Sequence, residues 1–176
     1  YNSGKKITAS TLFDLASITK SAATSLAVMK LYDEGKLSLE DKIGNILPYL
    51  SGSDKAGITI AELLTHTSGL PAYIPFYKDL LENNTWNPLY MNPTPTPLFK
   101  IEGARGVYIS SQVPGTILRK IADCKLGRKE YKYSDLGFIL LKEAVEKISG
   151  QPFETFLTEN FYRPLDLKSL CFNPLK

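Results

Sequence analysis

The sequence predicts a mainly α-helical chain with five to seven helices and little strand. An apolar run over residues 17–34 lacks the alternation of a strand and ends at Gly35. Residues 59–62 place Thr and Glu at the spacing of a helix-capping box. Residues 135–148 repeat apolar side chains at helical spacing. Together these three stretches favour a globular helical body.

The first part of the chain is expected to hold three helical segments. Residues 5–14 are predicted to be extended and to turn into the helix over 17–34, whose apolar side chains on nearly every side predict a buried helix. A second segment lies within residues 36–50. The capping box opens a third, short helix that ends before Gly69 and Pro71.

Residues 71–112 are expected to form a long proline-rich loop. Four prolines between positions 88 and 97 exclude a helix there and favour extended chain. A loop of this length in a compact domain is usually functional or poorly ordered. Its aromatic residues Trp86, Tyr90 and Phe99 either line a ligand site or hold the loop against the body.

The last third of the chain returns to helix. A helix is predicted over 114–122, a short strand or extended stretch over 129–133, and a longer helix over 135–148. Pro152 suits the first turn of a further helix, which stops before Pro164.

Composition excludes several classes of function. The 176 residues are 43% hydrophobic, enough for one domain or part of a larger one, and the net charge of +3 is too small and too scattered to indicate nucleic-acid binding. We find no transmembrane run and no signal peptide in these residues. One histidine and two cysteines without metal-binding spacing predict no metal site and no cofactor. Two buried thiols at Cys124 and Cys171 are favoured over a disulfide.

The candidate catalytic residues begin with Ser17 and Lys20. Three residues along a helix bring both side chains to one face, and the backbone amides of a first turn can stabilise an oxyanion. A lysine can remove the serine proton if burial lowers its pKa, and the apolar helix offers that burial. Ser3 and Lys6 repeat the spacing in a polar tail without a helix, so the spacing by itself is weak evidence.

A second motif, Tyr133-Ser134-Asp135, directly precedes the helix over 135–148. A tyrosine at this position could carry protons between a nucleophile and a leaving group, or it could be structural beside an N-cap serine. Tyr90-Met91-Asn92 has similar letters within the proline-rich loop but no helix after it.

Three blocks of the sequence resemble the serine β-lactamase-like family, which includes class C β-lactamases, D-alanyl-D-alanine carboxypeptidases and related esterases. The blocks are "LASITKSAATSLAVMKLYDEGKLSLEDKIGNILP", "ITIAELLTHTSGLP" and "YKYSDLGFILLKEAVEKISGQPFETFLTENFYRPLDL". They follow one another in the family's order from about residue 11 to 170. The resemblance implies that residues 1–176 are part of an α+β β-lactamase/transpeptidase-like domain: its helical half with the nucleophile helix, without most of its antiparallel sheet.

The resemblance also implies roles for four residues. Ser17 would be the acylated nucleophile, with its backbone amide as half of an oxyanion hole, and Lys20 its partner base. Tyr133 would act as general base and then general acid. Asp135 would contact substrate, but it stands where the family usually has Asn. An aspartate there favours a protonated Lys20, which shifts the base role to Tyr133, and it argues against β-lactam turnover more than against hydrolysis in general.

Two further expectations limit this interpretation. His66 lies in a family block near a helix end, so we expect it to tie a turn to its neighbours and not to join a catalytic triad. The family's third motif, Lys-Thr-Gly or His-x-Gly, is absent from these residues; Lys168-Ser169-Leu170 lacks the glycine. We therefore expect a fragment that is inactive by itself.

The sequence thus predicts a serine hydrolase that cleaves an amide, ester or β-lactam bond through an acyl-serine. The substrate would be a small molecule or a peptidoglycan-like peptide, handled in the periplasm, the cell envelope or outside the cell, by a parent chain with further domains. The alternative is a non-catalytic accessory or binding module of a multidomain protein, for example beside a glycoside hydrolase.

Overall fold

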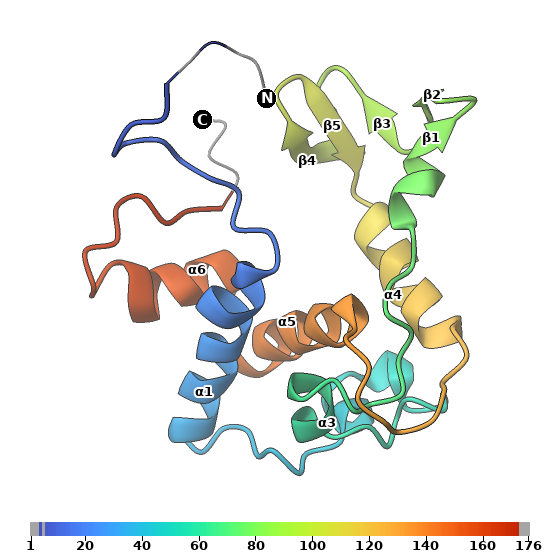
Figure 1. The fold of residues 1–176 in the computed structure, drawn as a ribbon. Coiled ribbons are helices and arrows are strands. Elements are labelled where there is room, and N and C mark those ends of the chain that lie inside the picture. Colours follow the sequence, from blue (N-terminus) through green and yellow to red (C-terminus); the bar gives the residue numbers. More distant parts are fainter. Residues whose placement is uncertain (1–3, 5, 173–176) are drawn as a thin grey trace.

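The computed structural model describes residues 4 and 6–172. Figure 1 shows a helical body with α5 (Asp135–Ser149) near its centre, between α1 (Leu26–Asp33) and α3 (Ile60–Leu64). α5 packs against both of these helices. The prediction of a mainly helical chain is confirmed, and the small antiparallel sheets stand at the other end of the molecule (Figure 1).

The helix α5 supplies much of the core. The Ser134 side chain caps it by accepting from the Leu136 amide at 3.2 Å, and Gly150 ends it in a left-handed conformation with φ 69°. α6 (Phe153–Leu157) follows Pro152, and the wider turns of η4 (Thr158–Tyr162) continue it. Both predicted helices are therefore confirmed. The buried residues of α5 are Leu136, Gly137, Phe138, Leu140, Leu141, Ala144 and Val145.

The helix predicted over 17–34 is present in two parts. η1 (Lys20–Ser25) has the wide turns of a π-helix, and α1 completes the helix. The expected burial on all sides is wrong, because Met29 is 63% exposed and Tyr32 is 55% exposed. The buried side chains of this helix gather on one face, and the helix contacts α5. That face buries Ala23, Ala27, Val28 and Leu31.

The segment between α1 and α3 is held by short helices. α2 (Ile43–Ile46) and η2 (Pro48–Leu50) lead to the predicted capping box, which is confirmed in both halves. Thr59 Oγ1 accepts from the Glu62 amide at 3.2 Å, and Glu62 Oε2 accepts from the Thr59 amide at 2.9 Å. These two bonds satisfy amides that the first turn of α3 would otherwise leave unpaired.

The proline-rich region over 71–112 contains short strands that the expectation of a long loop did not include. β1 pairs antiparallel with β2, and a second antiparallel sheet has the order β3-β5-β4. β-branched and aromatic residues flank a tight turn at Gly106, which has φ 70°, and this pattern favours a hairpin. The proline run lies outside any helix, as predicted. The elements from residue 71 to 123 are η3 (Phe76–Leu80), β1 (Leu81–Glu82), β2 (Thr85–Trp86), β3 (Met91–Asn92), β4 (Phe99–Ala104), β5 (Val107–Ser110) and α4 (Val113–Asp123).

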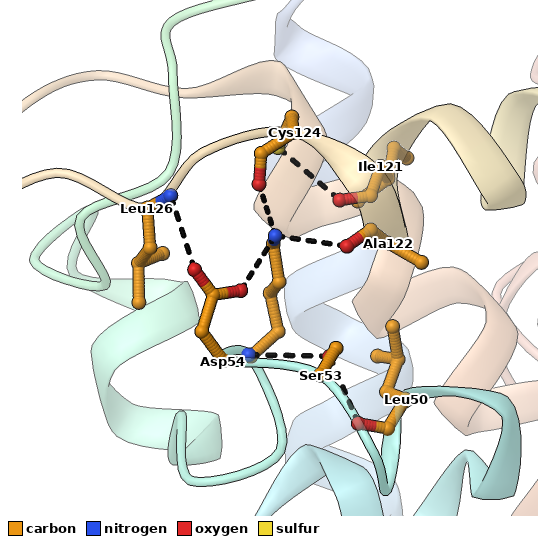
Figure 2. Close-up of polar contacts among 8 residues, drawn as sticks. Leu50, Ser53, Asp54, Ile121, Ala122, Cys124 and Leu126 are labelled. Carbon is orange, nitrogen blue, oxygen red and sulfur yellow. Dashed lines mark hydrogen bonds and ion pairs between the residues drawn. The ribbon is translucent and has the colours of Figure 1, made fainter.

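A buried lysine fastens the end of α4 to the rest of the body. Lys55 is only 2% exposed, and its ammonium donates to the carbonyls of Ala122, at 2.9 Å, and Cys124. It also pairs with Asp54 at 2.6 Å. Figure 2 shows Asp54 between this cluster and the Leu126 amide, from which it accepts a hydrogen bond at 3.4 Å. The terminal carbonyls of α4 thus gain a cationic partner.

The remaining sequence predictions concern cysteines, metals and membranes. Cys124 and Cys171 are both free, as favoured, but Cys124 is only half-buried and Cys171 is exposed, so the expectation of two buried thiols is wrong. Within the described part of the chain, no group of acidic, histidine and cysteine side chains could hold a metal ion. No helix among residues 6–172 has the length and apolar character to cross a membrane.

Candidate active site

A strained turn presents Ser17 to solvent. The preceding residue, Ala16, has φ 43°, and its amide donates to Asp14 Oδ1 at 2.8 Å. Such left-handed backbone costs an alanine roughly 1–2 kcal/mol, and strained residues of this kind cluster at functional sites. Ser17 is exposed at the start of the helix, and its backbone amide donates to none of the described residues. That amide is therefore available to an oxyanion.

Lys20 lies on the same face as Ser17, as the spacing predicted. Its Nζ is 3.2 Å from Ser17 Oγ and 2.6 Å from Asp135 Oδ1. The Lys20 side chain is 17% exposed and that of Asp135 is 49% exposed. The two ends of the pair come from residues 115 apart in the sequence, so the fold itself assembles this contact.

The pKa of Lys20 does not shift in the direction that burial alone predicts. Burial lowers its pKa, but the hydrogen bonds and charges of Asp135 and Tyr133 outweigh burial, and the net pKa is raised. The expected lowering is therefore wrong, while the expectation that Asp135 favours a charged lysine is confirmed. At neutral pH Lys20 is an ammonium that donates to Ser17 and does not accept its proton.

Tyr133 completes the cluster from the other side. Lys20 Nζ lies 5.0 Å from the centroid of the Tyr133 ring. The approach of Lys20, followed by that of the Ser17 hydroxyl, lowers the pKa of the Tyr133 phenol. The same contact thus stabilises a charged lysine and brings a phenolate closer to neutral pH.

The segment that carries Tyr133 is tied to the turn after α3. Ser134 Oγ donates to the Pro71 carbonyl at 2.6 Å, and the Asp135 amide donates to the Ala72 carbonyl at 2.8 Å. The Ser134 amide donates to His66 Nδ1 at 3.2 Å. The expectation that His66 ties a turn to its neighbours is confirmed.

A cavity of about 570 Å³ opens beside Lys20 and Asp135. Phe138 and Phe153 are among its walls, and α5 and α6 also contribute the charged side chains of Lys142, Glu146 and Glu154. Ser17 and Tyr133 do not line it, so the cluster stands at its edge. A cavity of this size with aromatic walls and several polar groups suits a small-molecule site.

The other residues suggested by the sequence lie elsewhere. Tyr90-Met91-Asn92 runs into β3, where the Tyr90 carbonyl accepts from the Ser110 amide at 2.9 Å. Trp86 and Phe99 do not line the cavity beside Lys20 either. Ser3 lies outside the described residues. Sequence reasoning missed Asp14 and Ala16. Their only signal in the sequence is an aspartate two residues before a backbone amide from which it can accept a hydrogen bond.

Comparison with known proteins places the chain in a family. A family model described as Beta-lactamase matches residues 1–176. An N-acetylmuramyl-L-alanine amidase of Bacillus subtilis (strain 168) is 36% identical over 182 residues, covering 97% of this chain and 35% of that protein. A provisionally named D-alanyl-D-alanine carboxypeptidase of Escherichia coli (strain K12) is 35% identical over 176 residues, covering 97% of this chain and 36% of that protein.

A solved structure agrees on the fold. FmtA from Staphylococcus aureus aligns with a TM-score of 0.68 at 22% identity, covering 98% of this chain and 39% of that one. The chain thus spans about a third of the length of the curated relatives. Because the family model covers every residue and the relatives exceed 30% identity along nearly the whole chain, the chain belongs to the beta-lactamase family.

Proposed function

We propose that Ser17 is the nucleophile of an acyl-serine hydrolase that cleaves an amide or ester bond. The observation that carries this proposal is the convergence of Ser17, Lys20 and Tyr133, with Lys20 Nζ 3.2 Å from Ser17 Oγ. A serine hydroxyl needs a neighbouring base, and an amide at a helix start can stabilise the oxyanion that its attack produces.

The raised pKa of Lys20 and the lowered pKa of Tyr133 support the following proton steps. The Tyr133 phenolate takes the Ser17 proton as Ser17 Oγ bonds to the substrate carbonyl carbon. Tyr133 then returns that proton to the leaving nitrogen or oxygen as its bond to the carbonyl breaks. Water attacks the acyl-serine, Tyr133 takes its proton, and Ser17 regains a proton as the acid is released. Lys20 stays charged and stabilises the phenolate and the negative charge that develops.

Asp135 supports a preference among substrates. It lines the cavity, and an ionised carboxylate only accepts hydrogen bonds. We expect it to favour substrates that present an N–H or an ammonium group there. An amide bond in a cell-wall peptide meets this requirement, and both curated relatives carry names of that kind. Such a substrate would place the protein in the cell envelope or outside the cell.

The activity is expected to need more chain than these 176 residues. The curated relatives are almost three times as long as the region they share with this chain. A second oxyanion donor is part of most acyl-transfer sites, and its loss costs about 100- to 1,000-fold in rate. We therefore expect residues 1–176 alone to acylate slowly and the full natural chain to acylate fast.

Covalent labelling tests the proposal. The full natural chain is incubated with a fluorophosphonate and, separately, with a penicillin, and the adduct is located by mass spectrometry. We expect a fluorophosphonate adduct on Ser17 that Ser17→Ala abolishes. The matched control is Ser21→Ala, which alters an exposed serine one turn along the same helix and should leave the adduct in place. No adduct with either probe would overturn the proposal and favour the non-catalytic module.

A further inference from the structure

We infer that His66 is the positioning residue that holds Tyr133 at Lys20, and that it does so only while its imidazole is neutral. This inference rests on the proposed role of Tyr133 as the base. It concerns the single histidine of the chain, which touches neither Ser17 nor the cavity beside Lys20.

His66 binds the backbone on both sides of Tyr133. Its carbonyl accepts from the Lys132 amide at 2.8 Å, and its Nδ1 accepts from the Ser134 amide at 3.2 Å. The backbone amides of the residues before and after Tyr133 therefore both donate to His66. The Ser134 bond fixes the peptide unit directly after the Tyr133 Cα, and the Lys132 bond fixes the peptide unit one residue before it. Together they limit how far the backbone that carries the phenol can move.

The imidazole also packs against the phenol. The ring centroids of His66 and Tyr133 are 4.5 Å apart, with the planes tilted by 41°. The ring centroid of Phe138, in α5, lies 5.2 Å from the centroid of the same imidazole. Tyr133 is 42% exposed, so the histidine is a main contact that limits where its ring can lie. The backbone bonds and the ring contact thus act on the same side chain.

The backbone of His66 is strained, which indicates a specific role for its side chain. It has φ 58°, directly after α3, where Gly or Asn is the residue that adopts left-handed backbone most easily. A glycine would relieve the strain and still offer the carbonyl to Lys132. Only a side chain with an acceptor near the position of Nδ1 can also bind the Ser134 amide.

Protonation would release one of the two bonds, because an imidazolium carries protons on both nitrogens and cannot accept. The charged groups that face His66 are Lys20 and Asp135, with the phenols of Tyr131 and Tyr133 beside it. Burial, followed by the charge of Lys20, holds the pKa of His66 below its ordinary value, while Asp135 acts in the opposite direction. His66 is thus neutral at pH 7, and the bond is lost as pH falls from about 6.5 through that lowered pKa.

Two variants distinguish a positioning role of His66 from a purely structural role. His66→Ala removes the ring and the acceptor. His66→Asn keeps an acceptor oxygen close to the Nδ1 position and suits left-handed backbone. The rate of Ser17 labelling by a fluorophosphonate is measured in the full natural chain from pH 4.5 to 8, with circular dichroism to confirm folding.

We expect His66→Ala to label on the order of 10- to 100-fold more slowly at pH 7.5, the loss typical of a misplaced catalytic group. His66→Asn should recover most of that rate. It should also lack the step in rate that the wild type shows as His66 protonates. A His66→Ala variant that labels as fast as the wild type, or a step that persists unchanged in His66→Asn, would overturn the inference.

A second measurement does not depend on activity. The Tyr133 phenol is titrated by nuclear magnetic resonance with ¹³C-labelled tyrosine and assigned by its absence in Tyr133→Phe. We expect the pKa of Tyr133 to rise toward its ordinary value of about 10 in His66→Ala, because the phenol leaves Lys20. An unchanged titration would overturn the inference. If the wild type fails to label while this titration still shifts, the positioning stands and the proposed function fails.

Discussion

Two lysines of this chain make the same ion pair in different surroundings. Lys20 lies 2.6 Å from Asp135, and Lys55 lies 2.6 Å from Asp54. Lys55 directs its other hydrogen bonds to two backbone carbonyls, whereas Lys20 directs one to the Ser17 hydroxyl and faces the ring of Tyr133. The distance of an ion pair therefore says little about its function.

The partners of the two ammonium groups explain the difference. Backbone carbonyls neither gain nor lose protons, so the Lys55 cluster can only hold the end of α4 in place. A serine hydroxyl and a phenol can exchange protons, and the charge of Lys20 lowers the pKa of that phenol. We propose that the region around Lys55 contributes stability and the region around Lys20 contributes reactivity. The following variants probe that division, beginning with the largest expected effect.

Tyr133→Phe should lower the rate of Ser17 labelling by about 10²- to 10⁴-fold, the usual contribution of a general base. The phenylalanine keeps the ring next to His66 and removes only the hydroxyl. Stopped-flow or quenched labelling at pH 7.5 measures the rate. Tyr131→Phe is the matched control, since Tyr131 also contacts His66 but does not interact with Lys20. A wild-type rate in Tyr133→Phe would remove this residue from the mechanism.

Asp135→Asn should shift the pH profile of labelling toward lower pH. The carboxylate raises the pKa of both Lys20 and Tyr133, so its removal lets each group lose its proton earlier. More phenolate is then present at pH 7, and we expect labelling there to be up to about tenfold faster. Asp79→Asn, which breaks the remote ion pair with Lys120, serves as the control. A profile that moves toward higher pH would contradict this assignment.

Asp54→Asn is the corresponding change in the structural region and should leave labelling unchanged. The hydrogen bond from Lys55 is the main reason why the pKa of Asp54 is lowered. A carboxyl group with a lowered pKa stabilises the folded state at pH values above its ordinary pKa near 3.9. That stability is lost as pH falls through the lowered pKa. Because Asp54 is half exposed, we expect a loss of about 1 kcal/mol or less at pH 7. Urea unfolding at pH 7 and pH 3 should show the difference from wild type shrinking with acid.

Most of the helical fold was predictable because its signals are local. The capping box at Thr59 and Glu62, and the Ser134 and Gly150 caps, each act within a few residues of their own position. The hairpin of β4 and β5 was missed because the nearby prolines suggested a loop for the whole region. Pairing between strands is a less local property than a helix cap.

The candidate site was predictable in its residues but not in its protonation. Helical spacing placed Ser17 beside Lys20, a motif before a helix singled out Tyr133 and Asp135, and the resemblance to a family gave these two their expected roles. The raised pKa of Lys20 depends on how close Asp135 comes, which only the packing of α5 against the helix after Ser17 decides. The left-handed backbone of Ala16 and the burial of Lys55 likewise arise from tertiary contacts without a sequence pattern of their own.

The most direct test is a paired measurement on Lys20→Met and Lys55→Met in the full natural chain. Each variant is measured for the rate of Ser17 labelling and for the free energy of unfolding in urea. We predict that Lys20→Met lowers the labelling rate at least about 100-fold and changes the unfolding free energy by less than about 1 kcal/mol. Lys55→Met should lower the unfolding free energy by about 3 kcal/mol, because it leaves two carbonyls unpaired, while its folded molecules label at the wild-type rate. Loss of the same property in both variants would contradict the division between a reactive and a structural lysine.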